Sequence, residues 1–185
     1  MNRIFNKKDI LTLPNLLSVL RLLMIPVILL LYLKEKNYYA ATGMVILSGA
    51  TDIADGIIAR KCNMVSDFGK ILDPIADKLT QAALIICLSL KYSKMLWLII
   101  LFAVKEFIMA LLGYITIKCK DSVNSAKWYG KVSTFVLYAS MIIMIFIPDL
   151  PIEIANALTL LCAAILSLSL FMYIRFYIKI LCDRS

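Results

Sequence analysis

The chain has 185 residues, of which 62% are hydrophobic, and its mean hydropathy is +0.89. This composition excludes an ordinary soluble domain and predicts an integral membrane protein with a single domain over residues 1–185. The net charge of +8 comes from basic residues that lie between apolar runs, as in cytoplasmic loops, which argues against nucleic-acid binding.

The first 33 residues predict two helices. Residues 1–13 mix basic and apolar side chains, so we expect a short amphipathic helix at the membrane surface. Pro14 starts a second helix, and the apolar run 15–33 is long enough to span a bilayer, although Arg21 interrupts it and Pro26 is expected to kink it. A signal peptide is the alternative, but Arg21 and the lack of a small-residue cleavage site argue against it.

Five more apolar segments follow, separated by short polar connections. Each is long enough for a membrane span, and the predicted spans are 38–60, 71–90, 95–117, 132–147 and 152–173. The last residues, 174–185, are basic and mildly amphipathic. The sequence therefore predicts an all-α membrane protein in which residues 14–182 form a bundle of six transmembrane helices and a basic C-terminal end.

The basic residues near the span ends are distributed unevenly. Twelve of them fall on one side of the predicted membrane and four on the other. Lys and Arg are retained on the cytoplasmic side, so both termini are expected in the cytoplasm and the protein in a bacterial-type cytoplasmic (inner) membrane. The polar link between the second and third spans lies on the same side, so a site there would open inward.

An acidic cluster flanks this link. Residues 52–77 read DIADGIIARKCNMVSDFGKILDPIAD and hold five of the twelve acidic residues. Asp52 and Asp55 are three apart and Asp73 and Asp77 four apart, so each pair shares one helix face, and two antiparallel helices can turn the pairs towards each other. Acidic side chains are costly inside a membrane, so they indicate a functional site.

The cluster favours divalent cations. Four neighbouring carboxylates would repel one another, and cations would relieve that repulsion. The chain has no histidine, which leaves Asp and Glu as ligands and bases and favours Mg²⁺ or Mn²⁺. Two such ions a few ångström apart suit phosphoryl displacement. The five cysteines are scattered without a CxxC pair and are expected to be apolar fillers.

Small and polar residues accompany the acids. Gly56, Ala59 and Gly69 leave the adjoining helix faces uncrowded for a ligand, although such residues also serve as helix-packing contacts. Arg60 is placed to hold a phosphate or, alternatively, to anchor the end of the span, and Ser66 offers a hydroxyl in the link.

These residues resemble the complete signature of the CDP-alcohol phosphatidyltransferase family. Eight fixed positions over 26 residues match it: Asp52, Asp55, Gly56, Ala59, Arg60, Gly69, Asp73 and Asp77. The plan of six spans with both ends inside is also similar to that of the family.

The resemblance implies a reaction and a set of residue roles. A CDP-linked lipid, usually CDP-diacylglycerol, would donate a phosphatidyl group to an alcohol hydroxyl and release CMP. The four aspartates would hold two divalent cations, and Asp77 would also be the general base. The nucleotide and diphosphate would contact Asp55, Gly56, Ala59, Arg60, Ser66 and Gly69. A homodimer is likewise only implied by the resemblance.

The acceptor alcohol is expected to bind at the later spans. Lys131, in YGKVST, resembles a Gly-Lys of members with phosphorylated or phospholipid acceptors, and Arg175 could join it; positive-inside anchoring is the alternative for both. Lys105 and Glu106 are expected to neutralise each other within the fourth span, with an acceptor or helix-contact role as the alternative.

Among the subfamilies, the small size and six spans most resemble phosphatidylglycerophosphate synthase, which uses glycerol 3-phosphate. Lys105 departs from the Arg-Glu that bacterial members often have at this place. A cardiolipin synthase of the same superfamily, using phosphatidylglycerol, is the alternative. From other classes we considered a cation transporter and a scaffold with a decayed site. The outward halves of the second and third spans carry no ionisable group except tyrosines, and the motif is intact, which argues against both.

Overall fold

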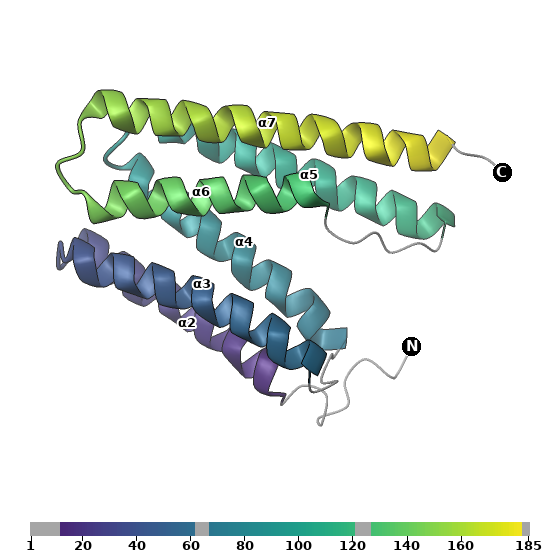
Figure 1. Cartoon of the computed structure of the whole chain (residues 1–185), viewed down its shortest axis with the longest axis horizontal. Coiled ribbons are helices and arrows are strands. Elements are labelled where there is room, and N and C mark those ends of the chain that lie inside the picture. Colours follow the sequence, from purple (N-terminus) through teal and green to yellow (C-terminus); the bar gives the residue numbers. More distant parts are fainter. Residues whose placement is uncertain (1–11, 62–66, 121–126, 183–185) are drawn as a thin grey trace. The chain divides into compact units, whose positions relative to one another are not determined.

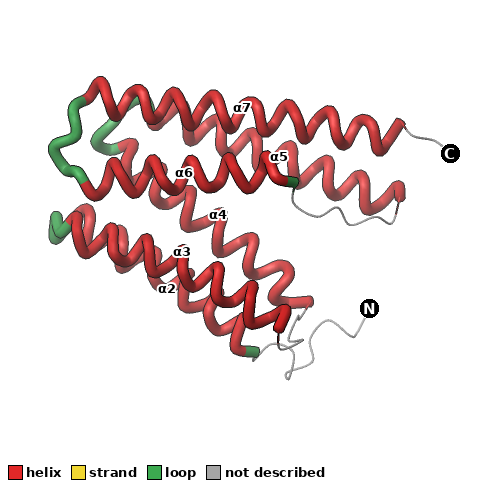
Figure 2. Tube along the Cα trace, in the orientation of Figure 1, coloured by secondary structure: helices red, strands yellow, loops and turns green. Residues whose placement is uncertain are grey.

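The computed structural model describes residues 12–61, 67–120 and 127–182, and this part of the chain is helical without any strand (Figure 2). It forms six helices: α2 (Leu13–Leu33), α3 (Tyr38–Lys61), α4 (Asp67–Ser89), α5 (Met95–Lys120), α6 (Trp128–Phe146) and α7 (Ile152–Cys182). The all-α expectation is confirmed. The predicted helix over residues 1–13 lies almost wholly outside the described residues.

Five of the described helices are long and apolar enough to cross a membrane. The candidate spans are Leu13–Leu33, Tyr38–Ile58, Met95–Thr116, Trp128–Phe146 and Ile152–Ile180. The protein is therefore a multi-pass membrane protein. Helix α4 is not among the five, because its 23 residues include Asp67, Lys70, Asp73, Asp77 and Lys78.

Three helices extend by four residues or more beyond the predicted apolar segments. Helix α4 begins at Asp67 rather than 71, α6 begins at Trp128 rather than 132, and α7 continues to Cys182 rather than ending at 173. The added residues of α4 and α6 include polar and aromatic side chains, and those of α7 mix basic, aromatic and aliphatic ones, yet the helix continues through them. At the start of α6, for example, the amides of Gly130 and Lys131 donate to the carbonyl of Lys127 at 3.1 and 3.3 Å. Hydropathy marks the apolar part of a membrane helix and not its full length.

The described helices group into two compact units. The first contains α2, α3 and α4 as far as Cys87, together with residues 145–148, and the second contains α5, α6 as far as Met144, and α7. The assignment of residues 1–185 to one domain stays a prediction.

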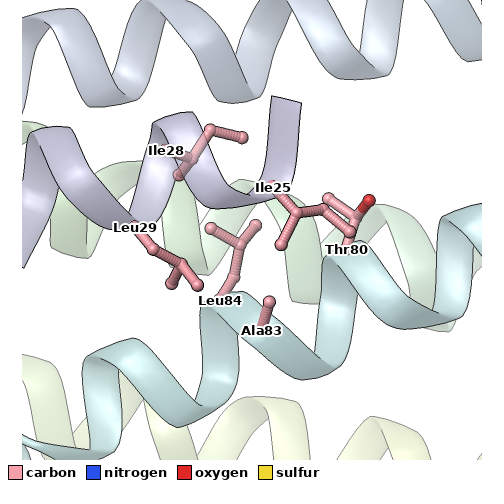
Figure 3. Close-up of a pocket in the computed structure, with 6 residues that line it drawn as sticks. All are labelled: Ile25, Ile28, Leu29, Thr80, Ala83 and Leu84. Atoms are coloured by element: carbon pink, nitrogen blue, oxygen red, sulfur yellow. The ribbon is translucent and has the colours of Figure 1, made fainter. Parts of the chain in front are cut away.

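Within the first unit, α2 contacts both of the other helices. It packs along α3 (Figure 1). Against α4 it places three side chains, and the two helices line a small apolar hollow with Ile25, Ile28, Leu29, Thr80, Ala83 and Leu84 (Figure 3). Helix α2 is therefore packed against both helices that carry the aspartates.

A tight connection joins α2 to α3. The amide of Glu35 donates to the carbonyl of Leu30 at 3.1 Å, and Lys36 has a φ of 51°, in the left-handed region. Asn37 then caps α3, because its Oδ1 accepts a hydrogen bond from the amide of Ala40 at 3.1 Å. Asparagine is a favoured N-cap residue, so this start of α3 is encoded locally.

In the second unit, a tyrosine cluster fixes the start of α6. The rings of Tyr129 and Tyr173 meet edge to face at 4.5 Å, and Tyr173 stacks with Tyr177 at 6.4 Å. The amide of Lys127 donates to Oη of Tyr173 at 3.2 Å. A Cβ on Gly130 would lie 2.2 Å from the same Oη, so this position requires glycine unless the tyrosine moves.

Candidate active site

The structure gathers four carboxylates in the first unit. Asp52 and Asp55 come from α3, and Asp73 and Asp77 come from α4. Asp52 lies within electrostatic range of Asp73 and Asp77, and Asp55 lies within range of Asp52 and Asp73. Their surroundings differ, because the side chain of Asp55 is 3% exposed and that of Asp52 is 45% exposed.

Arg21 of α2 bridges the two aspartates of α3. Its Nη1 lies 2.6 Å from Oδ1 of Asp52, and its Nη2 donates a hydrogen bond to Oδ2 of Asp55. The Arg21 side chain is 1% exposed. A buried guanidinium is tolerated only when carboxylates compensate its charge, so the three side chains depend on one another. In the sequence, Arg21 stood out only as an interruption of an apolar run.

Ser18, one turn before Arg21, reaches the other helix of the cluster. Its fully buried hydroxyl contacts Oδ1 of Asp73 and also lies 3.1 Å from the carbonyl of Pro14, and its single hydrogen can serve only one of them at a time. Asn15 is also buried, at 2% exposed. The sequence carried a signal for this face, since Asn15, Ser18 and Arg21 recur every third residue in an otherwise apolar run.

Asp77 is held by residues of its own helix. Nε2 of Gln81 donates to Oδ2 of Asp77 at 2.8 Å, and Nζ of Lys78 lies 3.8 Å from the same oxygen. Gln81 is 1% exposed. A buried glutamine four residues after an aspartate lies on the same helix face, so the spacing could have identified it.

The donor set suits a hard divalent cation, although its geometry here is not that of a formed metal cage. Within the described ranges, no three acidic, cysteine or histidine side chains are arranged to hold an ion. The charge balance nevertheless favours a cation. Four carboxylates lie within electrostatic range of one another, and the described cations that contact them are Arg21 and Lys78. Carboxylate oxygens are the ligands that Mg²⁺ and Mn²⁺ prefer.

The other motif residues are placed only in part. Gly56 lies on α3 directly after Asp55, and Gly69 is buried on α4 four residues before Asp73. Ala59 and Arg60 belong to the last turns of α3, but their side chains, like Ser66, lie outside the described residues. Contacts of these residues with a nucleotide stay a prediction.

The predicted acceptor residues belong to the second unit. Lys131 is exposed on α6, and Arg175 is exposed on α7 with its guanidinium 5.8 Å from the ring centre of Phe171. Lys105 is buried, and its Nζ lies 2.9 Å from Oε1 of Glu106. The expected mutual neutralisation of Lys105 and Glu106 is thereby confirmed.

The model of one protein family, described as CDP-alcohol phosphatidyltransferase, matches residues 11–171 of the chain. The chain belongs to this family. It is therefore a membrane transferase of phospholipid biosynthesis, as the motif indicated. The matched range includes α2 with Ser18 and Arg21 as well as the aspartates of α3 and α4.

Individual relatives point to a subfamily. The chain is 36% identical to a Rickettsia felis protein named CDP-diacylglycerol--glycerol-3-phosphate 3-phosphatidyltransferase, over 72% of this chain and 74% of the relative. It is 32% identical to a Mycobacterium tuberculosis protein named "Probable phosphatidylglycerophosphate synthase", over 89% of this chain and 79% of the relative. A third match, 44% identical over 46% of this chain and 14% of the relative, is a Schizosaccharomyces pombe fusion of a CMP-forming cardiolipin synthase and a mitochondrial hydrolase.

Proposed function

We propose that this enzyme transfers the phosphatidyl group of CDP-diacylglycerol to glycerol 3-phosphate and releases CMP, giving phosphatidylglycerophosphate. The acceptor oxygen attacks the phosphorus that bears the diacylglycerol, the bond from that phosphorus to the oxygen of CMP breaks, and the acceptor proton leaves to a base. The observation that carries the proposal is the gathering of Asp52, Asp55, Asp73 and Asp77 from α3 and α4. The names of the Rickettsia and Mycobacterium relatives support the choice of acceptor.

In this proposal the four aspartates hold two divalent cations, Mg²⁺ or Mn²⁺. When bound, these cations would offset the charge of the diphosphate and of the departing CMP. Two aspartates on each of α3 and α4 supply carboxylate oxygens for two such ions, and the donor diphosphate would supply further oxygen ligands.

Asp77 is proposed as the general base. Gln81 and Lys78 both contact its Oδ2 and so fix the orientation of the carboxylate. A base must be held within hydrogen-bond reach of the proton that it takes, and this support from the same helix provides such a constraint.

The remaining contacts follow the motif. Gly56, Ala59, Arg60, Ser66 and Gly69 are proposed to line the CDP part of the donor together with Asp55. Lys131 and Arg175 are proposed to bind the phosphate of the acceptor, and their exposed positions on α6 and α7 leave their charges available.

We further propose six spans with both termini and the active site at the cytoplasmic face, in a bacterial-type inner membrane, and a homodimeric enzyme. The excess of basic residues on one side supports the orientation. Helix α4 would be the sixth span. Its 23 residues reach about 35 Å, and the cost of its charges is reduced because Ser18 and Gln81 contact its aspartates.

The decisive experiment incubates the purified protein with CDP-diacylglycerol and Mg²⁺ or Mn²⁺ in three arms: glycerol 3-phosphate, phosphatidylglycerol and no acceptor. CMP release is measured, and the lipid product is identified by mass spectrometry. We expect CMP and phosphatidylglycerophosphate in the first arm only. Absence of CMP with every alcohol tried would refute the transferase proposal.

The match to the S. pombe fusion protein makes cardiolipin synthesis the second candidate. That reaction uses the same donor and the same carboxylates and differs only in its acceptor. CMP and cardiolipin in the phosphatidylglycerol arm, with none in the glycerol 3-phosphate arm, would favour it.

A further inference from the structure

We propose that Arg21 is a positioning residue that acts as an internal counter-cation: its guanidinium holds Asp52 and Asp55 against α2 and competes with divalent cations for these two carboxylates. The inference rests on the proposed binding of divalent cations at this site. It adds a role for α2, which lies outside the eight-position motif.

The first support is the burial of the ion pair. Arg21 and Asp55 are 1% and 3% exposed, so neither charge is stabilised by solvent. Asp55 also lies within electrostatic range of Asp52 and Asp73, whose negative charges oppose its own. The Arg21 guanidinium is the described positive charge that contacts both carboxylates of α3, so it offsets this repulsion when α2 and α3 pack.

The second support is that these contacts do not saturate the guanidinium. Nη1 and Nη2 face the two carboxylates, but Nε has no hydrogen-bond partner among the described residues. Arg21 is therefore held through its contacts with these two carboxylates, and another cation that takes the same oxygens would compete with it.

A competition follows from these contacts. A divalent cation that binds Asp52 or Asp55 must share their oxygens with Arg21 and is repelled by its charge. Removing the charge of Arg21 should thus strengthen cation binding, and it should make the packing of α2 on α3 depend on the added cation. A role for Arg21 in packing alone predicts a loss of stability that is the same with and without cation.

The test compares wild type with Arg21→Gln and Arg21→Lys. Thermal unfolding of each purified protein is recorded in EDTA and in Mn²⁺, and free Mn²⁺ is titrated by electron paramagnetic resonance. For Arg21→Gln we expect roughly tenfold tighter Mn²⁺ binding and a rise in Tm on adding Mn²⁺ that exceeds the wild-type rise by roughly 3–5 °C. Arg21→Lys keeps the charge, so its Mn²⁺ affinity should stay within about threefold of wild type.

Lys105→Gln is the matched control, because it also removes a buried cation that contacts a carboxylate but lies on α5 in the second unit. Its Tm should fall equally in EDTA and Mn²⁺. The inference is wrong if Arg21→Gln gives the same Mn²⁺ affinity and Tm rise as wild type, or if it cannot be purified folded even in Mn²⁺. If instead no protein binds Mn²⁺ and CMP release by wild type needs no cation, it is the proposed cation site that fails.

Discussion

Arg21 of α2 and Asp55 of α3 form an ion pair across two helices, with side chains that are 1% and 3% exposed. The same guanidinium reaches Asp52, whose side chain is 45% exposed. One arginine therefore links a buried carboxylate and a half-exposed one, so the two motif aspartates on α3 have different surroundings.

Replacing these two aspartates should have unequal effects on stability. Asp55→Asn leaves the buried guanidinium without its main partner and should lower the free energy of unfolding by about 3 kcal/mol. Asp52→Asn removes a contact that solvent already screens and should cost less than about 1 kcal/mol. Thermal unfolding in EDTA compares the two variants. Equal losses of unfolding free energy would contradict the larger effect that we assign to the buried aspartate.

Asp77→Asn should abolish turnover and preserve the fold. The amide is nearly the same size as the carboxylate but cannot accept the acceptor proton, so we expect CMP release to fall by roughly 100-fold or more. Its Tm in EDTA should stay close to wild type, and it should still bind CDP-diacylglycerol. A variant with near-wild-type CMP release would show that another group is the base.

Gln81→Leu tests the support of that base. Leucine fills a similar volume on the buried face of α4 but cannot donate to Oδ2 of Asp77, so the carboxylate loses its 2.8 Å hydrogen bond. We expect kcat to fall by roughly tenfold with little change in KM for either substrate. Gln81→Asn keeps the amide on a shorter side chain, so its kcat should lie between those of wild type and Gln81→Leu. A change in KM alone would assign Gln81 to substrate binding.

Gly130→Ala should perturb the start of α6. The new Cβ would lie 2.2 Å from Oη of Tyr173, so the tyrosine must move, at a cost of about 1–3 kcal/mol. Adding Tyr173→Phe removes the clashing oxygen and should restore part of the loss. Gly43→Ala is the control, because nothing lies within 4 Å of its Cβ position, and thermal unfolding should find it neutral or slightly stabilised.

Asn37→Ala should weaken the start of α3 without affecting the chemistry. The cap to the amide of Ala40 is lost, which should cost about 1 kcal/mol, whereas Asn37→Asp keeps an acceptor oxygen and should retain stability. Asn37 lies just before α3, whose first residue, Tyr38, is about 21 Å along the helix axis from Asp52. We therefore expect kcat to be unchanged in both variants. A fall in kcat for either would contradict this separation.

The fold could be read from the sequence because apolar runs identify membrane helices. All six described helices were predicted, and the errors lie at ends such as Asp67 and Trp128, where polar or aromatic residues continue the helix beyond the hydropathy signal. The aspartates and their pairing on helix faces were also predictable, because their spacing is local.

The partners of the aspartates were harder to predict, because they come from tertiary packing. Asn15, Ser18 and Arg21 share one face of α2, but spacing alone does not say which helix that face meets. Arg21 was therefore described only as an interruption of the first apolar run, and its contact with Asp55, 34 residues later, appears only when α2 lies against α3. Gln81 was missed for a different reason: its spacing from Asp77 was visible, but spacing alone does not show that the two side chains form a hydrogen bond.

The burial of Arg21 also bears on how the chain enters the membrane. Helix α2 is made before α3, so its arginine meets the bilayer before either aspartate partner is available. A central arginine raises the cost of inserting an isolated helix by roughly 2.5–3.5 kcal/mol. The candidate span that carries it has a mean hydropathy of 2.5, the highest of the five. The leucine-rich remainder of α2 can thus keep the helix in the bilayer until α3 is inserted beside it. Asp52 and Asp55 then neutralise the charge that α2 carried alone during insertion.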